Sequence, residues 1–62
     1  MIVRIILNGE VKHLWEKEDA EAIKTYDAVV KTYQDGLMSN HKVTVDLLTK
    51  DMEVILTETM ER

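Results

Sequence analysis

The chain has no cysteine, no proline and no phenylalanine, and it has only two glycines and one tryptophan in 62 residues. Without cysteine it forms no disulfide bond and has no thiol nucleophile, whereas small secreted domains usually depend on disulfides. We therefore expect a cytoplasmic protein. Because one tryptophan and two tyrosines are the only aromatic residues, a core must consist mainly of Ile, Leu, Val and Met.

Long apolar runs and clusters of basic residues are also missing. No segment approaches the roughly 20 apolar residues that cross a bilayer, and the first residues predict a strand rather than a signal peptide. The eight Lys and Arg residues are scattered, no two are adjacent, and the net charge is −4. Nucleic-acid-binding proteins concentrate positive charge against the phosphates. The composition therefore argues against binding to DNA, RNA or an anionic membrane.

Residues 2–15 are the most informative segment, because Asn8-Gly9 lies between two apolar runs. A type I′ turn needs positive φ at both central residues, and this dipeptide is the strongest short-range signal for such a hairpin. We predict a hairpin over 2–15, with a two-residue turn and a regular register that pairs Ile2 with Trp15.

In that register both faces of the hairpin are apolar. One face carries Val3, Ile5, Leu7 and Leu14, and the other carries Ile2, Ile6, Val11 and Trp15. Such a hairpin needs cover on both faces, and the sequence does not tell which face the rest of the chain covers. A bulge or a different turn would mix the two faces.

The remaining residues predict a helix and a second hairpin. Apolar residues recur every three or four positions between Ala22 and Tyr33, which predicts a helix over about 19–35. We expect Asp19 to cap its N-terminus and Gly36 to end it in a left-handed conformation. Alternation over 41–59 predicts a hairpin. We expect it to turn at Thr49-Lys50, pairing Val45 with Val54, and to be apolar on one face.

The element order predicts an α+β fold in one domain, residues 1–62. We expect a two-layer sandwich, an antiparallel β-sheet (ββαββ order) with one helix packed across one face. The order of strands in the sheet stays open. If residues 2–15 formed a single bent strand, the order would instead be βαββ.

No residue pattern predicts catalysis or metal binding. His13 and His41 lie in different predicted hairpins, and no cysteine completes a zinc site. Ser39 beside His41 lacks the orienting group and oxyanion hole of a nucleophilic site, and the two glycines are too few for a phosphate-binding loop. We expect a protein that is not an enzyme, with no cofactor, no metal and no small-molecule substrate.

The apolar face left uncovered is the strongest functional signal. We expect it to bind another protein and to mask part of that protein's surface, as a bacterial or phage inhibitor or adaptor of this size would do. The expected contact residues are Ile2, Arg4, Ile6, Val11, His13 and Trp15, of which Arg4 and His13 supply directional polar contacts.

Two alternatives remain open at this point. The same face, or an exposed sheet edge, could join two copies in a homodimer. Alternatively, Asp46, Asp51, Glu53 and Glu58 could form an acidic strip that mimics a nucleic acid, although Lys42 and Lys50 interrupt it.

Overall fold

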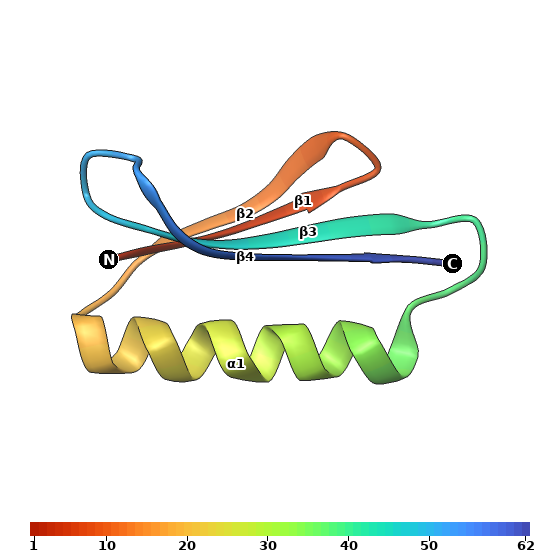
Figure 1. The fold of residues 1–62 in the computed structure, drawn as a ribbon, viewed down its shortest axis with the longest axis horizontal. Coiled ribbons are helices and arrows are strands. Elements are labelled where there is room, and N and C mark those ends of the chain that lie inside the picture. The colour runs from red at the N-terminus through yellow and green to blue at the C-terminus, as the bar shows by residue number, and fades with distance from the viewer.

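The computed structural model describes all 62 residues as five elements. They are β1 (Ile2–Leu7), β2 (Glu10–Glu16), α1 (Asp19–Gly36), β3 (Lys42–Leu48) and β4 (Val54–Glu61). The four strands form one antiparallel sheet, and α1 lies across one of its faces (Figure 1). This arrangement confirms the predicted α+β sandwich. The chain's one helix lacks the combination of length and apolar character that a membrane-spanning helix needs.

The strand order is β2-β1-β3-β4, so the two central strands come from different hairpins. β1 pairs with β3 without interruption, from Ile2 opposite Leu48 to Leu7 opposite Val43. Asn8 continues this pairing through its N–H, which donates to the Lys42 carbonyl oxygen at 2.8 Å. As predicted, Asn8 and Gly9 form the β1–β2 turn with positive φ, at 50° and 85°.

The core lies between α1 and the face of the sheet that α1 covers. From the sheet it contains Val3, Ile5, Val43, Val45 and Leu47, and from α1 and the following residue it contains Ala22, Tyr26, Val30 and Leu37. Alternation in the central strands and helical spacing in α1 direct these residues towards one another. Val3 and Ile5 are among them, so α1 covers the face of β1 that carries these two residues.

The two ends of α1 differ from the expectation. The helix begins at Asp19, but Glu18 occupies the N-cap position and makes no side-chain cap hydrogen bond. At the other end Gly36 is still helical and does not have positive φ. The Leu37 N–H donates to the Tyr33 carbonyl oxygen at 3.0 Å instead. The predicted left-handed cap at Gly36 is therefore wrong.

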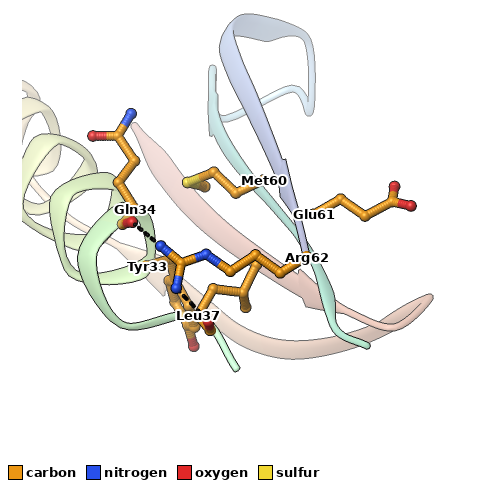
Figure 2. A pocket seen from close by; sticks show the side chains of 6 residues that line it. All are labelled: Tyr33, Gln34, Leu37, Met60, Glu61 and Arg62. Atoms are coloured by element: carbon orange, nitrogen blue, oxygen red, sulfur yellow. Dashed lines mark hydrogen bonds between the residues drawn. The ribbon is translucent and has the colours of Figure 1, made fainter. Parts of the chain in front are cut away.

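Arg62, the last residue, caps the C-terminal end of α1 in place of Gly36. Its guanidinium donates to the carbonyl oxygens of Gln34 and Leu37, each at 3.0 Å (Figure 2). The last carbonyls of a helix have no partner within the helix, and a cation there also favours the negative end of its dipole. Because the last turn of α1 contains no basic residue, Arg62 supplies both functions.

The register between β3 and β4 also differs from the prediction. Val45 pairs with Glu58 rather than with Val54, and the connection runs over 49–53. The Thr49 hydroxyl accepts the N–H groups of Asp51 and Glu53, each at 3.2 Å, and stabilises this longer turn. From Leu47 to Lys42 the register moves by four residues. Because this shift is even, Leu56 stays on the same face as Val45, as predicted. The bulge beside Leu47 instead places Val54 opposite Leu48 on the other face, so the predicted position of Val54 is wrong.

Tyr26 gives the fold a testable response to alkaline pH. Burial of this side chain raises its pKa above the ordinary value of 10.0, and the charges of Glu58, Asp27 and Asp46 raise it further. A raised pKa means that the unfolded state loses the proton first. The contribution of Tyr26 to the free energy of unfolding is therefore constant below pH 10 and declines above it.

We expect Tyr26→Phe to reduce this alkaline loss of stability. Urea unfolding of both proteins at about pH 8 and about pH 11 measures the difference. An equal loss in wild type and variant would show that Tyr26 titrates normally in the folded protein.

Candidate interaction surface

A β-bulge in β2 determines which residues of the first hairpin share a face. β1 and β2 pair regularly from Leu7–Glu10 to Ile6–Val11, but the next residue of β1, Ile5, pairs with His13. Lys12 is the extra residue and has no partner in β1. One inserted residue reverses the side-chain alternation of everything that follows it in the strand.

The predicted contact face is therefore divided. Ile2, Arg4, Ile6 and Val11 share the face of the sheet that points away from α1, which we call the open face. His13 and Trp15 pair with the core residues Ile5 and Val3 and so lie on the α1 side. Leu14, which the predicted register placed on the same face as Val3, pairs with Arg4 and lies on the open face. The expectation that all six residues form one surface is wrong.

Trp15 packs at the margin of the core. It is half-buried against the core cluster, and its ring stacks on that of His13 with 4.8 Å between centroids and 14° between planes. His13 itself is exposed. The contacts of Trp15 in the structure are thus packing contacts of β2 on the core.

A charged pair occupies the centre of the open face. The Arg4 Nε and Nη2 atoms lie 3.1 and 2.9 Å from Asp46 Oδ2, and the Thr57 hydroxyl donates to Asp46 Oδ1 at 2.6 Å. The Asp46 side chain is only 5% exposed and that of Arg4 is 24% exposed. Because both carboxylate oxygens have partners, this buried charge is compensated. Next to this group, the hydroxyls of Thr44 and Thr59 are 3.0 Å apart.

Apolar side chains lie beside this polar centre, on β1 and β2. Val11 is 58% exposed and Leu14 is 54% exposed. They occupy successive positions of the open face, because their partners Ile6 and Arg4 are two residues apart in β1. Ile6 is half-buried. We call Ile6, Val11 and Leu14 the β2 patch.

Ile2 does not contribute to an accessible surface. It pairs with Leu48 on the open face, yet the two residues are 7% and 0% exposed. They lie at the end of the sheet where the β3–β4 connection curves away from α1 (Figure 1). Ile2 is thus a buried residue, and its predicted exposure is wrong.

The acidic residues do not form a single strip. Asp46 is buried and paired with Arg4 on the open face, whereas Glu58 pairs with the core residue Val45 and lies on the α1 side. This separation removes the basis for a duplex-like row of charges on one surface. The structure also contains no group of three or more His, Asp or Glu side chains arranged to hold a metal ion.

One open pocket lies between the end of α1 and the end of β4. It is lined by Tyr33, Gln34, Leu37, Met60, Glu61 and Arg62 (Figure 2). The Arg62 guanidinium already donates to two carbonyl oxygens of the helix end. The contacts of this pocket therefore hold α1 to β4, and its lining contains no serine, cysteine or histidine.

Comparisons of the chain with protein-family models, with curated proteins and with solved structures find no match.

The different roles of Trp15 and its neighbour Leu14 can be tested by stability measurements. Trp15→Ala removes a half-buried ring from the core margin and should lower the free energy of unfolding by about 2 kcal/mol. Leu14→Ala removes an exposed side chain and should change it by less than about 0.5 kcal/mol. Urea unfolding followed by far-UV circular dichroism measures both. Equal losses, or a larger loss for Leu14→Ala, would contradict the observed register.

Proposed function

We propose that the protein is a small protein-binding module, acting as an inhibitor or adaptor that masks a surface of a larger protein through its open face. The observation that supports this proposal is the exposure of Val11 and Leu14 at successive positions of a sheet face that no helix covers. Apolar side chains that are adjacent and uncovered are typical of interaction sites. The proposed contact surface is the β2 patch, with Arg4 beside it.

The energetics suit an interface centred on this patch. Full burial of a Val or Leu side chain stabilises by about 1.5–3 kcal/mol. Since Val11 and Leu14 are each about half exposed, covering the pair would contribute about 1.5–3 kcal/mol to binding. That is the contribution of a hot spot, and further contacts around it would have to supply the rest of the affinity.

The Arg4–Asp46 pair would form the polar margin of this interface. Because Asp46 is compensated within the chain by Arg4 and Thr57, a partner need not supply a countercharge for it. The side chain of Arg4 remains 24% exposed, and its guanidinium has donors beyond those that Asp46 accepts. Arg4 could therefore donate to a carbonyl or carboxylate oxygen of the partner.

The size of the chain and its lack of cysteine complete the proposal. With 62 residues and no cysteine, the chain is comparable in scale with accessory proteins by which bacteria and their phages block or redirect larger proteins. We place its action in the cytoplasm, where thiols stay reduced and small domains fold without disulfides.

Substitution of Leu14 tests the proposed contact surface. Leu14→Glu places a charge in the β2 patch, and we expect it to weaken binding at least tenfold without changing the unfolding midpoint appreciably. Ile23→Glu is the matched control, because Ile23 is also exposed, at 42%, but belongs to α1 on the other side of the sheet.

Affinity capture from bacterial lysates, with and without phage infection, followed by quantitative mass spectrometry provides the readout. A protein retained by wild type and by Ile23→Glu, and lost with Leu14→Glu, would support the proposal. Retention by Leu14→Glu at the level of wild type would overturn it, as would the absence of any specifically retained protein.

A further inference from the structure

The two edges of the sheet differ in their readiness to pair with another strand. The edge strand β2 is interrupted in its middle by the bulge at Lys12, whose ammonium group pairs with Glu10 at 3.1 Å. Bulges and lysines are among the features that prevent edge strands from pairing. β4 has its bulge near its start, at Ile55, and pairs regularly with β3 from Leu56 onwards. Only β4 thus presents an uninterrupted outer edge.

The hydrogen bonds of β4 show which of its residues face outwards. The Arg62 N–H donates to the His41 carbonyl oxygen of the neighbouring strand at 3.0 Å. Backbone groups alternate between the two sides along an antiparallel strand. The N–H and C=O groups of Thr57, Thr59 and Glu61 therefore point away from β3, and all three residues are exposed.

We propose that β4 pairs antiparallel with β4 of a second copy, with Thr59 opposite Thr59 on a two-fold axis. The pairing would join the two four-stranded sheets into one continuous sheet. A strand edge whose donors and acceptors alternate is complementary to itself in the antiparallel direction, and an isologous contact closes after two copies.

The register follows from the requirement that outward-facing residues meet outward-facing residues. Three antiparallel registers of β4 against β4 of the second copy give both Thr57 and Thr59 an outward-facing partner within the strand. In the register centred on Glu58, the Glu58 carboxylates of the two copies lie directly opposite each other, and like charges in this position destabilise the pairing. The one centred on Thr57 extends across the bulge at Ile55 and places Glu61 opposite Glu53. The register centred on Thr59 has neither defect.

The charges of the preferred register are complementary. Glu58 lies opposite Met60 of the second copy and diagonally from its Arg62, and both residues are on the α1 side of the sheet. Long side chains reach such diagonal neighbours. Glu61 lies opposite Thr57 of the second copy, on the open face. No two like charges are opposite each other between Leu56 and Arg62.

This contact uses a different surface from the proposed function. The β2 patch is at the other edge of the sheet, so dimer formation through β4 leaves it free. The two proposals can consequently fail independently.

Because the chain has no cysteine, single cysteine variants report the register directly. In the proposed dimer the Cα atoms of the two Thr59 residues are about 5.5 Å apart, within the range of a disulfide. The matched control is Glu61→Cys, also on the exposed part of β4. In the proposed register position 61 of one copy lies opposite position 57 of the other. The two positions 61 are therefore offset by four residues, or about 13 Å along the strand, which is too far for a disulfide.

We expect light scattering of the wild-type protein to show a mass that rises with concentration from 7.2 kDa towards twice that value. On mild oxidation, we expect Thr59→Cys to form a covalent dimer at least tenfold faster than Glu61→Cys, with circular dichroism confirming that both variants fold. A wild-type mass that stays monomeric at millimolar concentration would overturn the proposal. Equal crosslinking of the two variants, or faster crosslinking of Glu61→Cys, would overturn the register.

Discussion

The single helix of this chain can cover only one face of a four-stranded sheet, and the other face must be stable without a second layer. On the covered face, strand alternation and helical periodicity assemble the core. On the open face the chain places its one buried ion pair, Arg4 with Asp46, at the centre of the sheet and completes it with Thr57. Of the apolar side chains on this face, Ile2 and Leu48 are buried at one end of the sheet, and others remain exposed at its margins. The exposed ones at the β1–β2 margin form the β2 patch.

The bulge at Lys12 determines which side chains lie at the β1–β2 margin of the open face. In a regular register without the bulge, in which Lys12 pairs with Ile5, Trp15 would lie on the open face and Leu14 beneath the helix. With the bulge, Trp15 packs at the core margin, and the open face carries Leu14 and Val11. The same bulge interrupts the outer edge of β2. One residue therefore contributes both to the choice of side chains on the open face and to the protection of that edge.

Local signals in the sequence predicted the elements and the fold class. Asn8-Gly9 adopts the positive φ values that its turn requires, and the spacing of Ala22, Tyr26 and Val30 correctly identified the buried side of α1. Features that depend on residues distant in sequence were not predicted. The order of strands was left open, and β1 pairs with β3 as well as with β2. The cap of α1 comes from Arg62 rather than from Gly36. The register within each hairpin was also wrong. The β3–β4 register was ambiguous because registers that differ by an even number of residues bury the same face. The bulge at Lys12 has no local signal, since both registers give the first hairpin apolar faces.

The central claim is that the face opposite α1 is the outer surface of the protein, with Val11 and Leu14 accessible to a partner. The most direct test is NMR of the dilute protein with a soluble paramagnetic probe, comparing the relaxation of methyl groups. The account predicts strong relaxation enhancement at Val11 and Leu14 and almost none at Val3, Ile5 and Val45, which face α1. Protection of the Val11 and Leu14 methyl groups in the free protein would contradict it, because something within the chain would then cover the open face.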